Sequence, residues 1–151
     1  GRGSRFSVLL PACRVPERRR TMTTPARRVT QCDVLVIDDE AMVRAQLRRL
    51  LERRGYTVVE ADSGRAGLAA LERKTPDVVV LDMTMPDMDG AEVLRSLRAA
   101  GSRVPVIVSS GYLDPSVEQK LSADAFQAFL AKPYSIADLD AALERALRAG
   151  G

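Results

Sequence analysis

The chain has 151 residues, of which 46% are hydrophobic and 28% are charged. This length suits one ordinary domain with its own core, and this composition excludes a disordered chain. The sequence contains no histidine, which excludes Ser-His-Asp and Cys-His catalysis and any histidine metal site. No apolar run is long enough to cross a bilayer.

The net charge of +3 is unevenly distributed along the chain. Residues 1–32 contain eight Arg and one Glu, a balance of +7, whereas residues 33–151 contain fifteen Lys or Arg and nineteen Asp or Glu, a balance of −4. The basic segment lacks interleaved aromatic residues and any readout motif, so we interpret it as a solvated linker. We expect no nucleic-acid partner and no membrane contact by this chain.

Three segments are expected along the chain. Residues 1–12 show an alternating strand-like pattern, residues 13–32 are rich in Arg, Thr and Pro and read as a linker, and residues 33–149 form the globular domain. The chain begins without an initiator methionine, which we interpret as a piece of a longer protein. Cys13 and Cys32 both precede the domain core. They build no disulfide scaffold and fit a reducing, cytoplasmic location.

Within the domain, short apolar runs alternate with helix-like stripes. The predicted strands are Asp33–Ile37, Thr57–Ala61, Asp77–Leu81, Pro105–Ser109 and Gln127–Ala131. The predicted helices are Glu40–Arg54, Ser63–Lys74, Ala91–Ala100, Pro115–Ala123 and Ser135–Leu147. Met42 belongs to the apolar stripe of the first helix, and Ser135 is the expected N-cap of the last one.

This alternation predicts an α/β fold. Strands that are nearly continuous runs of Val and Leu are typical of a parallel sheet covered on both faces, and right-handed crossovers then give a doubly wound sheet. We expect the flavodoxin-like fold, with five parallel strands in the order 2-1-3-4-5 and five helices. Its ligand site lies at the carboxyl edge of the sheet, between the first and third strands.

Charged residues gather where the predicted strands end. Asp38 and Asp39 follow the first strand, Asp82 follows the third, and Lys132 follows the fifth. Three carboxylates in one pocket repel one another unless a cation neutralises them, and Mg2+ suits such an oxygen-rich site. With a lysine to hold a phosphoryl oxygen, the pocket favours phosphoryl transfer to a carboxylate, which gives an aspartyl phosphate.

Simpler interpretations exist for each of these residues alone. Asp38 and Asp39 also suit a turn and a helix N-cap, and Lys132 suits a solvated loop. Ser109 and Ser110 both end the fourth strand, where a hydroxyl can bond a phosphoryl oxygen. Further along, Asp87 and Asp89 are expected as turn and N-cap residues, not as ligands.

Four motifs at these strand ends resemble the signature of two-component response-regulator receiver domains, and the resemblance covers residues 33–149. The motifs are Ile37-Asp38-Asp39-Glu40, Leu81-Asp82-Met83-Thr84-Met85-Pro86-Asp87-Met88-Asp89-Gly90, Ser110-Gly111-Tyr112 and Ala131-Lys132-Pro133. Each motif alone is common, but four in order, each at a strand end, are specific.

The resemblance implies a role for each matching position. Asp82 corresponds to the phospho-acceptor and to a metal ligand, and Asp39 to a direct ligand of Mg2+. Asp38 corresponds to a carboxylate that holds the metal mainly through water, and the backbone carbonyl of Thr84 to a further ligand. Lys132 corresponds to the pocket lysine.

The resemblance also implies a switch. Ser110, not Ser109, corresponds to the switch hydroxyl, because Gly111 then takes the small-residue position beside the phosphoryl group. Phe129 stands where the family has an aromatic rotamer switch, although a plain core role for this residue is equally open. Pro133 is expected to follow a cis peptide bond.

The implied partner is a histidine kinase or a histidine phosphotransfer domain, since the chain has no histidine of its own. Residues 1–12 are similar to the closing glycine motif and last strand of a histidine-kinase ATP-binding domain. The resemblance then implies that the parent protein is a hybrid sensor histidine kinase. Some kinases of this kind are anchored in a membrane. The resemblance also allows a homodimer through the fourth and fifth helices. It implies no conventional enzyme in this chain, only self-catalysed phosphorylation and dephosphorylation.

Competing functions make different demands on the sequence. A haloacid-dehalogenase-like phosphohydrolase also uses a strand-end Asp, Mg2+ and Lys, but it needs a second Asp two residues later, where this chain has Thr84. A degenerate receiver acting only as a binding surface does not need the intact set of Asp39, Asp82 and Lys132. A DNA-binding protein would need a readout element, which the leader lacks.

Overall fold

The computed structural model describes residues 32–111 and 125–150. The described elements in chain order are β1 (Asp33–Ile37), α1 (Ala41–Glu52), β2 (Thr57–Ala61), α2 (Gly64–Arg73), β3 (Val78–Asp82), α3 (Gly90–Ala99), β4 (Val106–Ser110), β5 (Ala128–Ala131) and α5 (Ile136–Ala149). The expectations for residues 1–12 and for nearly all of the 13–32 linker lie outside these ranges.

The five strands form one parallel sheet in the order β2-β1-β3-β4-β5. The predicted flavodoxin-like sheet and its strand order are therefore confirmed. Four helices are present in the described residues, not the five that we expected, because the helix expected over 115–123 falls outside them. None of these four helices is long and apolar enough to cross a bilayer.

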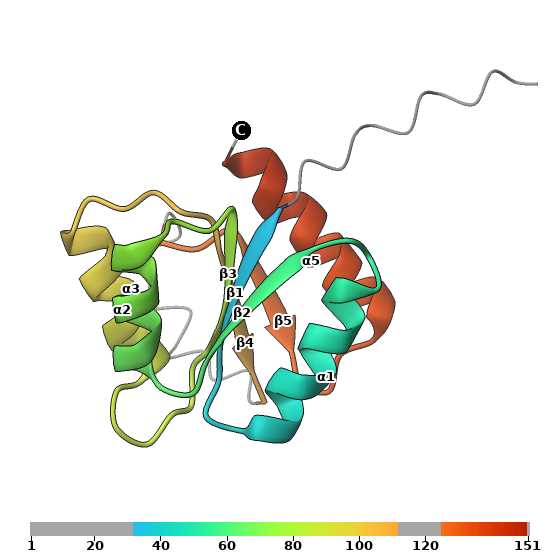
Figure 1. Ribbon diagram of the computed structural model, residues 1–151, viewed down its shortest axis with the longest axis horizontal. Coiled ribbons are helices and arrows are strands. Elements are labelled where there is room, and N and C mark those ends of the chain that lie inside the picture. Colours follow the sequence, from blue (N-terminus) through green and yellow to red (C-terminus); the bar gives the residue numbers. More distant parts are fainter. Residues whose placement is uncertain (1–31, 112–124, 151) are drawn as a thin grey trace, which may run out of the picture.

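The helices cover the sheet as two layers, with α1 and α5 on one side and α2 and α3 on the other (Figure 1). Alternate residues of each strand face opposite layers, as the two-residue period of a strand requires. In β4, Ile107 packs with the α1/α5 side, whereas Val106 and Val108 pack with the α2/α3 side. Both faces of the inner strands β1, β3 and β4 are consequently buried, which explains their continuous apolar runs, whereas the edge strand β2 is largely exposed.

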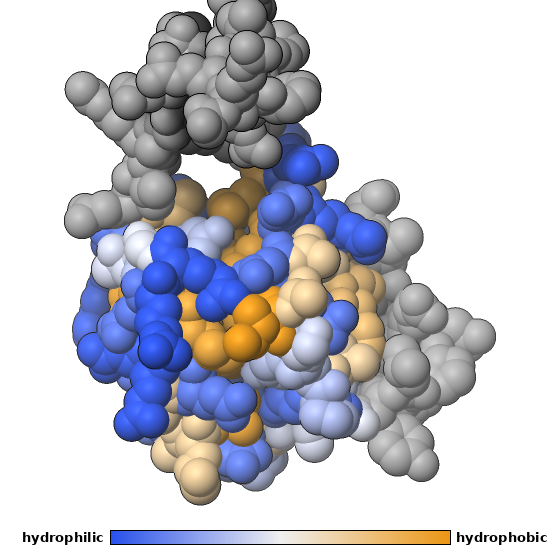
Figure 2. All heavy atoms as spheres, turned by 90° about the vertical axis from the view of Figure 1, so that its right-hand side faces the viewer, coloured by the Kyte–Doolittle hydropathy of each residue, from blue (hydrophilic) through white to orange (hydrophobic). Residues whose placement is uncertain are grey.

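The outer surface of the α1/α5 side is mainly hydrophilic and surrounds a hydrophobic patch (Figure 2). Partly buried side chains that pack against this layer include Leu50 and Leu147. Met42, which we placed in the apolar stripe of α1, is instead 80% exposed. That prediction was wrong because, at 3.6 residues per turn, Met42 lies about 140° around the helix axis from the buried Leu47.

Local sequence explains where several helices begin and end. Asp89 and Ser135 are the N-caps of α3 and α5, as expected, and each side chain accepts a backbone N–H of the first turn. The chain turns after α1 at Gly55, whose φ of 86° favours glycine. The N-cap of α1 is Glu40. Asp38 and Asp39 are therefore not N-caps, although Asp38 Oδ1 accepts the backbone N–H of Glu40, as expected of a turn residue.

Candidate functional site

The carboxyl edge of the sheet brings the predicted acidic residues together. One carboxylate oxygen from each of Asp38, Asp39 and Asp82 lies within 4.8 Å of the other two. Asp38 and Asp82 are only 2% and 4% exposed, whereas Asp39 is exposed. The cluster is thus buried on one side and open on the other, an arrangement that allows a hydrated cation to enter.

Lys132 supplies the positive charge of this cluster. Its Nζ donates to Asp38 Oδ2 at 2.8 Å and to Asp82 Oδ1 at 3.0 Å. The backbone N–H of Lys132 donates to the carbonyl of Ser110 at 2.8 Å, which fixes the end of β5 against β4. The peptide bond between Lys132 and Pro133 is cis, as the resemblance implied.

Burial and the neighbouring charges shift the ionisation of this pair. Burial raises the pKa of Asp82 above its usual range and Asp38 and Asp39 add to the rise, although the Lys132 ammonium opposes it. Burial lowers the pKa of Lys132, but its hydrogen bonds to Asp38 and Asp82 outweigh that effect, and the net pKa is raised. The lysine therefore stays charged at neutral pH.

Asp38 is held at four of its atoms. Its backbone N–H donates to the carbonyl of Ala61 at 3.2 Å, and its own carbonyl accepts from Arg44 Nη1 at 2.7 Å. Its Oδ1 accepts the backbone N–H of Glu40 at 2.8 Å, and its Oδ2 accepts from Lys132. These bonds fix the turn from β1 to α1, and Asp39 is part of that turn.

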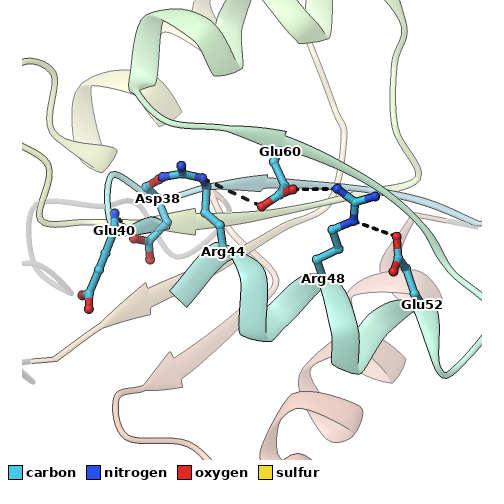
Figure 3. A network of polar contacts seen from close by, with 6 residues as sticks. All are labelled: Asp38, Glu40, Arg44, Arg48, Glu52 and Glu60. Carbon is cyan, nitrogen blue, oxygen red and sulfur yellow. Dashed lines mark hydrogen bonds and ion pairs between the residues drawn. The ribbon is translucent and has the colours of Figure 1, made fainter. Parts of the chain in front are cut away.

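An ion-pair network connects this turn to the edge strand β2 (Figure 3). Arg44 Nε lies 3.9 Å from Glu60 Oε1, and Arg48 Nη1 lies 3.1 Å from Glu60 Oε2. Arg48 also pairs with Glu52 at 2.8 Å on the surface of α1. Sequence reasoning missed Arg44 because α1 carries several arginines, and only the position of Glu60 on β2 distinguishes it.

Gly90 allows α3 to begin directly beside Asp82. A Cβ at Gly90 would lie 2.4 Å from the carbonyl oxygen of Asp82 and 2.8 Å from Met83 Cα, both of them backbone atoms. The Gly90 N–H donates to the Met83 carbonyl at 3.2 Å. We had assigned this glycine only to loop punctuation, since sequence alone does not show which backbone approaches it.

Gly90→Ala is therefore expected to lower the free energy of unfolding by about 1–3 kcal/mol, because the backbone on either side of the clash must move. Chemical denaturation measures this change. Gly111→Ala is the control, because no atom of the residues that the structure describes lies within 4 Å of a Cβ added there, and we expect its effect to stay within about 0.5 kcal/mol. Equal stability of the Gly90 variant and the original chain would contradict this packing argument.

The two residues expected to form a switch lie on the α2/α3 side of the sheet. Ser110 ends β4 and is 4% exposed. Phe129 is the register partner of Val108 and packs, partly buried, against the α2/α3 core. Ser110 follows Val108 on the same face, so both candidate residues face one layer.

Thr84 and Tyr134 complete the surroundings of the pocket. Thr84 lies two residues beyond β3 and is exposed. Tyr134 packs against the α1/α5 core, and burial raises the pKa of its phenol, with smaller effects from Lys132, Asp38 and Asp82. Tyr134 therefore lies near the pocket, on the α1/α5 side of the sheet.

The donor set fits a hard divalent cation. Carboxylate oxygens from β1 and β3, with a backbone carbonyl in the loop after β3, are the ligands that Mg2+ accepts in proteins, usually together with retained water. The exposed carboxylate of Asp39 suits direct binding, and the buried Asp38, already bonded to Glu40 N–H and Lys132, suits a contact through water.

Removal of the ionisable group at Asp82 should change how stability depends on pH. The pKa of Asp82 is raised in the folded state, so the stability that its protonation contributes is fully present below its unfolded pKa of about 3.9. That contribution is lost as pH rises through the higher folded pKa. Without divalent cations, the original chain should lose stability relative to Asp82→Asn as pH rises above about 4. Denaturation of both chains at several pH values measures this, and a pH-independent difference would contradict it.

Comparisons with known proteins agree with the geometry of this site. A family model for the response regulator receiver domain matches residues 34–144. The sensor kinase CckA of Brucella abortus (strain 2308) is 37% identical over 152 aligned residues, which cover 92% of this chain and 16% of that protein. The response regulator MprA of Mycolicibacterium vanbaalenii is 40% identical over 116 residues, which cover 76% of this chain and 50% of that protein. The chain thus spans half or less of the length of these relatives.

Solved structures show the same fold. The chemotaxis protein CheY4 of Vibrio cholerae superposes with a TM-score of 0.73 at 28% identity, covering 78% of this chain and 99% of that one. A response regulator receiver domain protein from Clostridium thermocellum superposes with a TM-score of 0.72 at 30% identity, covering 78% of this chain and 94% of that one.

Proposed function

This chain belongs to the response regulator receiver family, the phospho-accepting signalling modules of two-component systems, and on that basis we propose that Asp82 is its phospho-acceptor. The observation that carries this proposal is the position of the Asp82 carboxylate. It is 4% exposed, ends β3 inside the acidic cluster, and lies 3.0 Å from the Lys132 ammonium. Family membership also favours this role over the phosphohydrolase alternative.

The proposed reaction moves a phosphoryl group from a phosphohistidine to Asp82. A carboxylate oxygen of Asp82 attacks phosphorus, an O–P bond forms, and the P–N bond to the histidine breaks. The electron pair of that bond stays on the imidazole, which takes up a proton from solvent. Bound Mg2+ supplies positive charge to the phosphoryl oxygens in such a pocket.

The other pocket residues divide the remaining work. Asp38, Asp39, Asp82 and the backbone carbonyl of Thr84 would hold the metal. Lys132 already reaches Asp82, so a small movement brings its ammonium to a phosphoryl oxygen. That contact stabilises charge that develops as the phosphoryl group transfers.

Ser110 and Phe129 are the proposed switch residues. A hydroxyl at the end of β4 can bond a phosphoryl oxygen on Asp82, and that bond would draw the end of β4 inward. Phe129 contacts the same α2/α3 layer from the neighbouring strand, so a displacement there alters its packing. The result is a shift between two states of the domain, with a changed surface for a partner.

The proposed donor is a histidine kinase or a histidine phosphotransfer domain, and the proposed parent protein is a hybrid kinase. The alignment with the sensor kinase CckA covers 92% of this chain, which is more than the part from 34 to 144 that the family model matches. Similarity therefore extends outside the receiver segment itself. A homodimer remains part of the proposal, with its surface near α5.

Labelling with acetyl phosphate tests the acceptor role. The chain should gain one phosphoryl group in the presence of Mg2+ and none when EDTA is present, as intact mass measures, and peptide mapping should place the group on Asp82. A phosphoryl group on any other residue, or labelling that survives EDTA, would refute the proposal. Replacing acetyl phosphate by a phosphorylated histidine phosphotransfer domain tests the donor class separately.

A further inference from the structure

One polar group near the pocket has no role in the function proposed above. The side chain of Ser109 is buried, with the residue 2% exposed, and its hydroxyl has no hydrogen-bond partner in the described part of the chain. Such a group is destabilising, because it loses its bonds to water on folding and receives none in return. Alanine or valine would fill this position without that cost.

Ser109 lies directly beside Asp82 in the sheet. The register pairs Ser109 of β4 with Asp82 of β3 on one side and with Leu130 of β5 on the other. Ile107, two residues earlier, packs with the α1/α5 layer, so Ser109 faces the same layer. Asp82 follows Val80 on that face as well. The hydroxyl and the carboxylate are therefore neighbours on one face of adjacent strands.

The side chain of Lys132 must reach past β4, the strand that carries Ser109. The lysine follows β5, and its Nζ reaches Asp82 at the end of β3 and Asp38 beyond β1. Strand β4 lies between β5 and β3. Lys132 stands two residues after Leu130, which packs with the α1/α5 layer. The lysine side chain therefore leaves β5 on the face where Ser109 lies, and it reaches past the end of β4 to Asp82, the register partner of Ser109.

We propose that Ser109 is a positioning residue for the phosphorylated pocket, a role that rests on Asp82 being the phospho-acceptor. Phosphorylation removes the negative charge of the Asp82 oxygen that Lys132 contacts at 3.0 Å in this structure, and the ammonium moves toward the phosphoryl oxygens. The hydroxyl of Ser109, which rotates among three staggered positions, then accepts a hydrogen bond from the Lys132 ammonium. Its bond holds the lysine in place and prolongs the phosphorylated state.

Volume-matched substitutions separate the hydroxyl from the space that it fills. Thr and Val have the same shape but only Thr has a hydroxyl, so Ser109→Thr and Ser109→Val form one pair, and Ser109→Ala gives the small apolar form. Ser96→Ala, at an exposed position of α3, is the control serine. Each full-length variant is labelled with acetyl phosphate and Mg2+, the donor is removed, and loss of the phosphoryl group is followed by intact mass.

The phosphoryl lifetime should shorten roughly 2- to 10-fold in Ser109→Ala and Ser109→Val, which is the ratio that one net hydrogen bond provides. Ser109→Thr and Ser96→Ala should retain the original lifetime, and thermal unfolding of Ser109→Ala should occur at the same or a higher temperature. Unchanged lifetimes in both apolar variants, or an equal loss in the Thr and Val variants, would overturn the role of Ser109 and leave a buried hydroxyl that only binds water. An original chain that takes no label on Asp82 would instead overturn the proposed function.

Discussion

Asp82→Asn is expected to reduce labelling by acetyl phosphate below detection. The asparagine side chain keeps the shape of the carboxylate but offers no anionic oxygen to attack phosphorus. The neighbouring carboxylates do not replace it, because Asp38 is occupied by Lys132 and the Glu40 N–H, and Asp39 is the exposed group best placed to bind the metal. Intact mass after incubation with acetyl phosphate and Mg2+ measures the result.

Asp87→Asn is the matched control for this experiment. Asp87 is an exposed residue in the loop after β3, outside the cluster formed by Asp38, Asp39 and Asp82. Its variant should gain the same single phosphoryl group as the original chain. Persistent labelling of Asp82→Asn, or loss of labelling in Asp87→Asn, would each show that the acceptor lies elsewhere.

Lys132→Ala is expected to lower the maximal labelling rate roughly 10²–10³-fold, the cost typical of removing one donor that stabilises transition-state charge. The same change should improve metal binding. Removing the ammonium leaves two buried carboxylates without their shared partner, so the pocket becomes more negative. We expect the half-saturating Mg2+ concentration to fall by about tenfold, since one charge at this range commonly shifts an ionisation by 1–3 pKa units.

The opposite signs of these two effects make the experiment specific. A variant that had only lost its fold would label poorly and also bind Mg2+ poorly. Labelling rates measured over a series of Mg2+ concentrations separate the two quantities. Lys74→Ala is the control, because Lys74 pairs with Asp33 at the start of β1, at the opposite edge of the sheet, and is largely exposed. A Lys132 variant with a normal rate, or with weaker Mg2+ binding, would contradict the assigned role.

Much of the site was predictable because strand ends are a local property of the sequence. A run of Val and Leu followed by Asp38-Asp39, by Asp82 or by Lys132 is visible in a few residues, and parallel strands bring such ends to one edge. Helix boundaries moved by one or two residues; for example, α1 covers Ala41–Glu52 and not Glu40–Arg54. Those shifts do not change which residues reach the edge.

The sequence by itself determined which segments form strands and helices and how these alternate along the chain, because that alternation depends on short-range hydrophobic periods. The alternation in turn predicts a parallel sheet and the set of residues at its carboxyl edge. Only the tertiary structure decided which groups contact one another. It pairs Lys132 with Asp38 and Asp82 and buries Asp38 while exposing Asp39. It also places Ser109 beside Asp82 in the sheet, with no partner for its hydroxyl among the described residues. Each of these outcomes depends on distances across several strands, and the linear pattern of a chain does not encode such distances residue by residue.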